Sequence, residues 1–497
     1  MNIIKKINQL HKRWNTMNII KEINKLNKNA EHEKIIEIIT AIPKEQRDTE
    51  LFSLLARAYN NTKRYDEALD NLMYIREECI DDALWNYRIG YAYYYKGDKE
   101  KAEMHFKKVY DLNNEDTDAY NFYMLCTEDK DDGINFEERV NRFWKWFEEN
   151  EKVISDYIDK KSDMSSEEII KFVSNGVGLI SNNLKFNFGG NYEFTFTVES
   201  KEYLFYLTPR ISAAMPEKLK SKWKFFPYMP KQDIDDANFV VYDKDLSFKE
   251  ILVSAEYDED DNFFNLKFFN EKLNQLNENY AYNAFYVMLE HAVGENIFKL
   301  YLLGNVKKSN KKLDGMIELT KLYDFIMDTL KKENNDIITD PIDNYIDYDC
   351  MPKNNFFRED IFMGSTCYKE LISDYADENV RAIVNISKMG ARAVYLAYEL
   401  LDNKDDVYDD ENVKKFLDER DKIANELESI MGEKGSGKEI GILLGSAFGI
   451  LCGYIDLLLY NQDEFIKRAE EVLKKYNHKF KLLRFRQYSE TIKTFND

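Results

Sequence analysis

A glycine-rich segment near the C-terminus has the residue types of a phosphate-binding loop. GEKGSGKE, from Gly432 to Glu439, matches the GxxxxGK spacing, but Glu439 stands where a Ser or Thr hydroxyl should reach magnesium. The segment also follows a predicted helix and precedes an apolar strand, whereas a phosphate loop follows a strand and opens a helix. We therefore interpret it as a glycine-rich helix C-terminus with a polar loop, and expect no nucleotide cofactor.

A cysteine offers a second possible chemistry. Cys367, in the sequence GSTC, can act as a nucleophile only if a histidine lies beside it in space. The five His are dispersed, and no recognisable motif places any of them. We therefore expect Cys367 to be a buried thiol.

An acidic stretch, EYDEDDN, has part of a calcium-loop pattern. Asp258, Asp260 and Asn262 have the right spacing for ligands. Phe263 stands where a glycine should turn the chain, and Phe269 where the last Glu should close the site. The sequence therefore predicts a solvated loop and no metal.

Composition excludes several classes of protein. A chain of 497 residues exceeds one ordinary core, and 44% hydrophobic with 32% charged residues is typical of folded domains. The net charge of -21 argues against nucleic acid and anionic membranes and favours a basic partner. The five Cys lack CxxC spacing, which indicates reduced thiols in a cytoplasmic protein. The sequence does not indicate an oligomeric state.

The N-terminus gives no export signal. MNIIKKINQLHKRWN has charges every few residues and lacks the unbroken apolar core of a signal peptide. A near-duplicate, MNIIKEINKLNK, begins at Met17. The residues from Met1 to this point are therefore either a copied helix or an extension upstream of the true start.

Small and large side chains recur with a period of 34 residues. Ala56 is matched by Gly90 and Ala68 by Ala102, at positions that allow helix backbones to approach closely. Larger residues beside them fill the space between helices. The pattern resembles the tetratricopeptide repeat family, which implies two tandem helical hairpins from Thr49 to Asn114. Upstream, Asn18 to Leu26 and Glu33 to Ile42 are expected to form a degenerate hairpin, and Thr117 to Cys126 a further helix that covers the open end.

The resemblance implies a concave groove lined by the first helix of each pair. Tyr rings in such a groove give a large contact area at a small entropic cost. The alternative is that these Tyr pack against the neighbouring hairpin or the next domain. The family's Lys and Asn clamp for a peptide C-terminal carboxylate is not matched. The groove candidates are Glu50, Ser53, Arg57, Asn60, Leu84, Tyr87, Tyr91 and Tyr94.

Beyond the repeats, from residue 134 to 335, the sequence predicts an α+β domain. A Trp-rich helix from Phe136 to Lys160 is followed by a hairpin around Gly189 and Gly190 and by further strands. Helical patterns return from Tyr280 to Tyr301 and from Met316 to Lys332. RFWKWFEENE and SKWKFFPYMP loosely resemble bacterial α+β domains of unassigned activity that follow helical repeats.

A second α+β domain is predicted from residue 340 to 497. FREDIFMGSTC and FRQY resemble segments of hypothetical repeat-associated proteins. The apolar run from Ile440 to Tyr460 could suggest a membrane helix, but its uncharged part falls short of the roughly 20 residues that a bilayer core requires. We predict two buried strands joined through glycines instead.

The fold class is therefore multidomain: an all-α helical-repeat solenoid over residues 1–130, then two α+β domains with small, mainly antiparallel sheets. We expect an adaptor or scaffold that binds a protein or peptide through the repeats. Two alternatives stay open. One is a bacterial immunity or antitoxin protein that covers a basic toxin. The other is an enzyme assembled in the C-terminal region, with Cys367 and Arg358 as candidate residues.

Overall fold

The computed structural model describes residues 19–128, 133–199, 201–260, 262–302, 306–333, 337–353, 357–400, 410–487, 489 and 491–496. The chain forms two compact units. Unit 1 comprises residues 1–132 and 379–384, and unit 2 comprises residues 133–378 and 385–497. Helices and sheets occur together, so the prediction of a multidomain α+β protein is confirmed. Met1 and Met17 lie outside the described residues.

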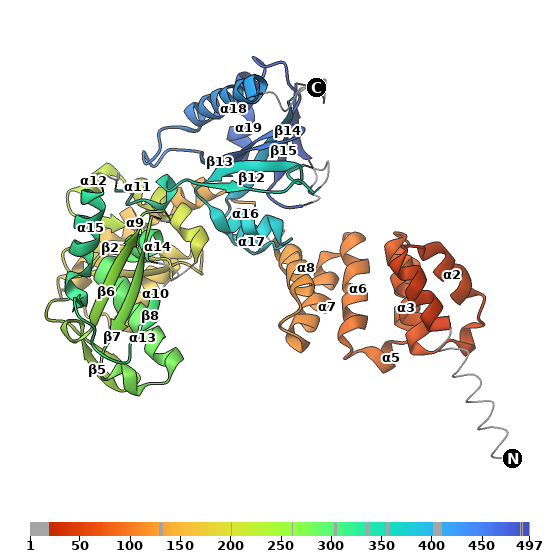
Figure 1. Cartoon of the computed structure of the whole chain (residues 1–497), viewed down its shortest axis with the longest axis horizontal. Helices are drawn as coiled ribbons and strands as arrows, with labels where there is room; N and C mark the ends of the chain where they lie inside the picture. The colour runs from red at the N-terminus through yellow and green to blue at the C-terminus, as the bar shows by residue number, and fades with distance from the viewer. Residues whose placement is uncertain are drawn as a thin grey trace. The chain divides into compact units, whose positions relative to one another are not determined.

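Unit 1 consists of helices that contact their neighbours in chain order (Figure 1). Short turns join them, because polar residues and left-handed backbone positions separate the apolar stripes. A helix over residues 19–28 comes first. It is followed by α2 (His32–Thr40), α3 (Thr49–Asn61), α4 (Tyr65–Tyr74), α5 (Arg76–Cys79), α6 (Ala83–Tyr95), α7 (Lys99–Leu112) and α8 (Thr117–Glu128).

Three helices of unit 1 start in the same way at intervals of 34 residues. Asp48, Asp82 and Asp116 precede α3, α6 and α8. Their carboxylates accept hydrogen bonds from the backbone N–H three residues on, at 3.0, 2.7 and 2.9 Å respectively. Such a cap satisfies a donor that the first helical turn leaves free. The turns repeat too, since Lys63 and Gly97 both have left-handed φ angles, of 61° and 86°.

The predicted packing positions form the core of unit 1. Ala56, Ala68 and Ala102 are fully buried. Gly90 faces the ring of Phe106, and a Cβ at Gly90 would lie only 3.1 Å from that ring. Small residues therefore stand where helices approach closely, as the sequence predicts.

Unit 2 begins with a long helix, α9 (Phe136–Ile158), and a small aromatic sheet. The sheet order is β1-β2-β3, with β1 and β2 antiparallel and β2 and β3 parallel. The turn of the first hairpin contains Gly190, so the predicted hairpin is confirmed. The elements here are α10 (Ser166–Val177), β1 (Lys185–Gly189), β2 (Glu193–Thr197), α11 (Thr208–Ala213), α12 (Glu217–Lys220) and β3 (Lys224–Phe226).

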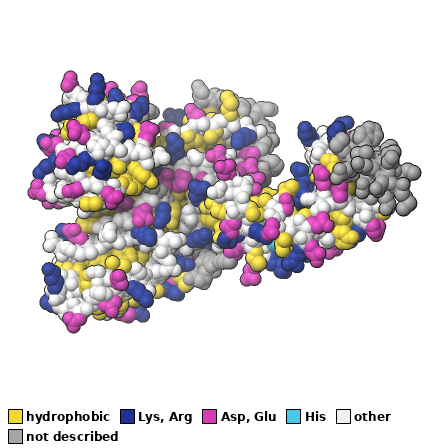
Figure 2. Space-filling model, turned by 90° about the horizontal axis from the view of Figure 1, so that it is seen from below, with side chains coloured by type: hydrophobic (Ala, Val, Ile, Leu, Met, Phe, Trp, Pro, Cys, Tyr) yellow, Lys and Arg dark blue, Asp and Glu magenta, His cyan; other side chains and the backbone are white. Residues whose placement is uncertain are grey.

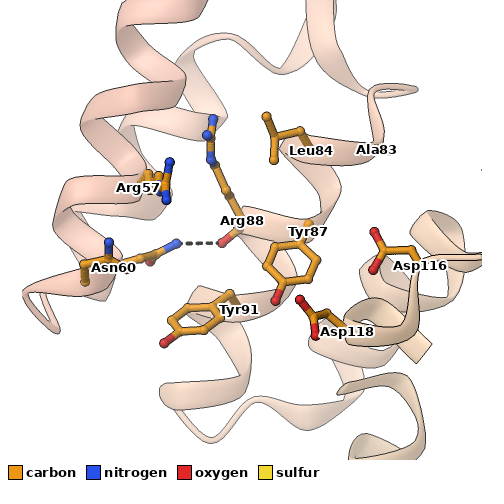
Figure 3. Close-up of a pocket in the computed structure, with 10 residues that line it drawn as sticks. Arg57, Asn60, Ala83, Leu84, Tyr87, Arg88, Tyr91, Asp116 and Asp118 are labelled. Carbon is orange, nitrogen blue, oxygen red and sulfur yellow. Dashed lines mark hydrogen bonds between the residues drawn. The ribbon is translucent and has the colours of Figure 1, made fainter. Parts of the chain in front are cut away.

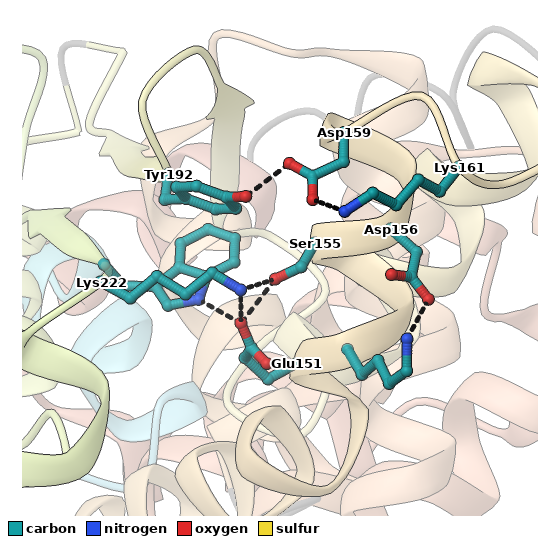
Figure 4. Close-up of polar contacts among 9 residues, drawn as sticks. Glu151, Ser155, Asp156, Asp159, Lys161, Tyr192 and Lys222 are labelled. Atoms are coloured by element: carbon teal, nitrogen blue, oxygen red, sulfur yellow. Dashed lines mark hydrogen bonds and ion pairs between the residues drawn. The ribbon is translucent and has the colours of Figure 1, made fainter.

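A cluster of hydrogen bonds and ion pairs connects the C-terminal end of α9 with the residues that lead into β3 (Figure 4). Glu151 accepts hydrogen bonds from Lys222 at 2.7 Å and from the Trp223 indole at 2.9 Å. Burial raises the pKa of Glu151, but these donors and Ser155 outweigh it, so the pKa is lowered overall. The cluster therefore holds Glu151 ionised in the folded state.

The next part of unit 2 is a four-stranded sheet in the order β8-β7-β6-β9, with a separate β4-β5 hairpin. The predicted helix from Met316 is wrong in its first residues, because Ile317 pairs with Val253 at the sheet edge and the helix begins only at Leu322. The elements are β4 (Asn238–Val241), β5 (Lys244–Ser247), β6 (Leu252–Asp258), β7 (Phe263–Phe269), α13 (Glu278–Val293), α14 (Glu295–Tyr301), β8 (Val306–Lys308), β9 (Ile317–Glu318) and α15 (Leu322–Lys332).

The last part is a seven-stranded antiparallel sheet in the order β10-β11-β13-β14-β12-β15-β16. The apolar run that could suggest a membrane helix forms the paired strands β13 and β14, as predicted. β16 was not predicted. The elements are β10 (Ile346–Asp349), β11 (Ile361–Thr366), α16 (Lys369–Ala376), α17 (Arg381–Lys388), β12 (Arg392–Glu399), α18 (Asp410–Met431), β13 (Gly441–Gly449), β14 (Cys452–Leu459), α19 (Gln462–Leu473), β15 (Phe480–Arg484) and β16 (Thr491–Phe495).

Both faces of this sheet are covered. On one face, Val394, Leu396 and alternate residues of β14 share a core with α18 and α19 (Figure 1). On the other face, Tyr395 lies edge-on to Tyr375 of α16, with ring centroids 6.4 Å apart. Strands that are buried on both faces read as continuous apolar runs, which explains the composition of β12 and β14.

The two regions predicted as separate α+β domains lie together in unit 2 and share buried contacts. The Tyr206 hydroxyl donates to the carbonyl of Cys367 at 2.6 Å. The Tyr460 hydroxyl donates to the carbonyl of Tyr206 at 2.9 Å. Tyr206 also stacks on Tyr368, with ring centroids 4.1 Å apart. These bonds join residues that are more than a hundred positions apart in sequence.

Candidate functional site

An open cavity of about 610 Å³ lies in unit 1, between α3, α6 and the start of α8. We call it the groove. The 34-residue period brings corresponding faces of these helices to the same side, because each begins with the same cap. The lining residues are Arg57, Asn60, Asn61, Ala83, Leu84, Tyr87, Arg88, Tyr91, Asp116 and Asp118 (Figure 3).

Five of the eight predicted groove residues line this cavity: Arg57, Asn60, Leu84, Tyr87 and Tyr91. The other three do not belong to the lining that the structure describes. Glu50 is exposed outside it. Ser53 contacts a lining residue, because its hydroxyl accepts a hydrogen bond from the Arg88 guanidinium. Tyr94 packs edge-on against Phe122, with ring centroids 5.1 Å apart.

The tyrosines of the groove are both lining and packing residues. Tyr87 contacts Phe106 and Phe122 edge-on, with centroid distances of 5.6 and 6.1 Å. Tyr91 contacts Phe122 in the same way at 5.6 Å. Burial raises the pKa of both Tyr hydroxyls, so they stay neutral at physiological pH. The two rings are therefore held in fixed orientations with one side open to the groove.

The basic end of the groove holds a buried charge. Arg88 is 7% exposed, and the Asn60 amide donates to its carbonyl oxygen at 3.0 Å. Burial and the nearby Arg57 lower the pKa of Arg88 to about 10. Within the described chain, neither arginine forms an ion pair with a carboxylate. With a pKa of about 10, the Arg88 side chain stays charged at neutral pH.

The acidic end is formed by the start of α8. Asp116 caps this helix and uses one carboxylate oxygen to accept from the N–H of Ala119. Asp118 is exposed in the first helical turn. Figure 3 shows Tyr87 between this pair of aspartates and the two arginines.

Sequence reasoning missed five lining residues, namely Asn61, Ala83, Arg88, Asp116 and Asp118. The period could have revealed Asp118, which stands 34 residues after Leu84. It conceals Arg88, which corresponds to Leu54 in the preceding hairpin and to Phe122 in the following one. An apolar packing position is where a groove arginine is least expected.

The residues considered for an enzyme in unit 2 serve its core. Burial raises the pKa of the Cys367 thiol to about 12, so the predicted buried thiol is confirmed. Arg358 is buried and forms an ion pair with Asp456. Although burial opposes its charge, Asp456 raises the pKa of Arg358 overall.

The segment that resembles a phosphate loop is filled by its own carboxylate. It follows α18 and precedes β13, as the sequence predicts. Glu439 accepts hydrogen bonds from the N–H of Gly435 and the hydroxyl of Ser436, both at 3.2 Å. It also pairs with the buried Arg210 at 3.7 Å. The anion that this loop binds is a residue of the protein.

The calcium-like stretch lies at the β6-β7 hairpin. Phe263 and Phe269 belong to β7 rather than to a metal-binding loop. Among the residues that the structure describes, no group of three or more His, Cys, Asp or Glu could hold a metal ion.

A search of the described helices for one long and apolar enough to cross a membrane finds none. On the face shown in Figure 2, acidic and basic side chains are interspersed with apolar ones over both units.

Comparison of the chain with protein-family models, with curated proteins and with solved structures gives no match.

Proposed function

We propose that this protein is an adaptor that binds a protein partner through the groove of unit 1, and that unit 1 is a tetratricopeptide-type solenoid. The observation that carries the proposal is the 610 Å³ cavity, which has a floor of fixed tyrosine rings and charged ends. Pockets of this kind are typical of binding sites, and Tyr and Arg are enriched at binding hot spots.

The repeated caps and turns support the solenoid assignment. Identical helix starts every 34 residues stack successive hairpins with a constant offset, and such an array presents one continuous face. We include α8 as the first helix of a third hairpin, because Asp116 caps it as Asp48 and Asp82 cap α3 and α6. In this proposal the cytoplasm is the place of action, because no cysteine of the described chain forms a disulfide.

The charge of the groove does not favour the immunity-protein alternative. Its lining contains two arginines and two aspartates, so it is neutral although the chain carries a net charge of -21. A site built to cover a basic toxin would concentrate carboxylates. The enzyme alternative has no support from Cys367 and Arg358, because Cys367 is buried and Arg358 is ion-paired with Asp456.

A quantitative affinity capture tests the proposal. Leu84 lines the groove and is 53% exposed, whereas Met104 is 71% exposed and lies outside the lining. We expect Leu84→Glu to lose partners that the wild type and Met104→Glu both retain, because a charge in the groove must be desolvated on binding. Mass spectrometry of the captured proteins from the source cell measures this. Equal partner sets for all three proteins would refute the groove as the binding site.

A further inference from the structure

The two ends of the groove carry opposite charges. Arg57 and Arg88 lie at the end formed by α3 and α6, and Asp116 and Asp118 at the end formed by α8 (Figure 3). All four charged residues line the same cavity. A ligand that spans the groove therefore meets a positive and a negative potential in turn.

The positive end is built around Arg88, on which Asp82 acts from a distance but which no carboxylate of the described residues contacts in an ion pair. Arg88 occupies a position that is apolar in the neighbouring hairpins, and its guanidinium donates only to the Ser53 hydroxyl among the bonds formed by the described residues. Burying a charge without an opposite partner costs free energy. Arg57, which is exposed beside it, adds to the positive potential instead of compensating it. A ligand carboxylate would supply the missing partner.

The negative end is open to a cation. Asp118 is exposed in the first turn of α8, and one oxygen of Asp116 is engaged in the helix cap. A flexible ammonium or guanidinium group can reach both carboxylates from the groove. Tyr87 and Leu84 lie in the same lining and offer apolar surface between the two ends.

We propose that the groove binds an extended segment of a partner protein with an acidic side chain, an apolar residue and a basic side chain in that spatial order. The acidic side chain lies against Arg57 and Arg88, and the basic one against Asp116 and Asp118. This inference rests on the proposed function and specifies its ligand. It replaces the expectation of a purely basic partner with a segment that carries both charges.

Selection of peptides by the full-length protein tests the inference. The probe is a displayed library of random peptides fused at their C-terminal ends, so that the only free carboxylates in them belong to side chains. Arg57→Glu and Asp118→Lys reverse the charge at one end each. Matched controls are Arg76→Glu and Asp70→Lys, which are exposed in unit 1 outside the lining.

We expect the wild type and both controls to enrich peptides that carry one acidic and one basic residue around an apolar one. Arg57→Glu should lose the enrichment of acidic residues, and Asp118→Lys that of basic residues. Arg57→Glu and Asp118→Lys should each bind the peptide that the wild type binds best at least tenfold more weakly than the wild type does. Fluorescence anisotropy at low salt measures these affinities.

The outcomes separate the two proposals. In one outcome, the enriched peptides bind the wild type but not Leu84→Glu, and they do not carry one acidic and one basic residue. This result would overturn the proposal of a ligand with both charges and would leave the proposed function standing. Selection of uniformly basic peptides would overturn it in the same way. The absence of any enrichment that depends on Leu84 would count against the proposed function itself.

Discussion

Arg88 illustrates why part of the groove could not be predicted from the sequence. The period identifies which positions face a neighbouring helix, and it places Arg88 in register with Leu54 and Phe122. Whether such a side chain is packed or opens into a cavity depends on the space that adjoining helices leave. The predicted residues Arg57, Asn60, Leu84, Tyr87 and Tyr91 were found because the period directly defines the outward face of the first helices.

Glu290, on α13 in unit 2, gives a prediction about pH at the same scale. Burial, with Glu295 and Glu199 nearby, raises its pKa from 4.5 to about 7. Between pH 4.5 and about pH 7, Glu290 therefore keeps its proton in the folded protein, whereas in the unfolded chain it has already lost it. Since the unfolded chain then carries fewer protons, this group makes stability fall as pH rises from about 4.5 to about 7.

Glu290→Gln should remove that dependence. The variant should gain about 1 to 3 kcal/mol relative to the wild type between pH 5 and pH 8, because the amide stays neutral. Urea unfolding at several pH values measures the difference. Glu278→Gln, at the exposed start of the same helix, is the control. A difference between variant and wild type that does not change with pH would contradict the assigned burial of Glu290.

At the scale of elements, local patterns predicted most helices and strands. The GlyGly hairpin, the paired strands β13 and β14 and the helical hairpins follow from periodicity and turn residues. The start of α15 was mispredicted because strand pairing by Ile317 overrides a helical pattern. β16 was missed because TIKTF is short and half-polar, and only its pairing with β15 defines it.

The repeated caps give a prediction at this scale. Asp48→Ala, Asp82→Ala and Asp116→Ala should each destabilise unit 1 by about 0.5 to 2 kcal/mol, because each leaves a first-turn N–H without its acceptor. Asp70→Ala, within α4, removes a carboxylate that is exposed and caps no helix, and should change stability by less than about 0.5 kcal/mol. Denaturant unfolding followed by helical circular dichroism measures all four.

Equal effects for the caps and the control would show that the aspartates are incidental to the helix starts. A loss confined to Asp48 and Asp82 would remove α8 from the repeat array. The acidic end of the groove, formed by Asp116 and Asp118, would then not belong to the repeat.

At the scale of the whole molecule, composition predicted the multidomain class, and long-range contacts determine how the later regions associate. The sequence suggested three domains, and the structure has two compact units, because Tyr206, Tyr460 and Arg210 join the later regions through buried contacts. Such contacts join residues that are distant in sequence, and no local pattern reveals them. Net charge likewise did not predict that the groove itself is neutral.

The central claim is that unit 1 binds a protein partner along α3, α6 and α8. Hydrogen exchange of the full-length protein, alone and with a partner captured by the wild type but not by Leu84→Glu, tests it directly. We expect slower exchange on binding in α3, α6 and the start of α8, because a bound segment excludes water from these helices and suppresses their local opening. Protection confined to unit 2, with unchanged exchange in these three helices, would contradict the account.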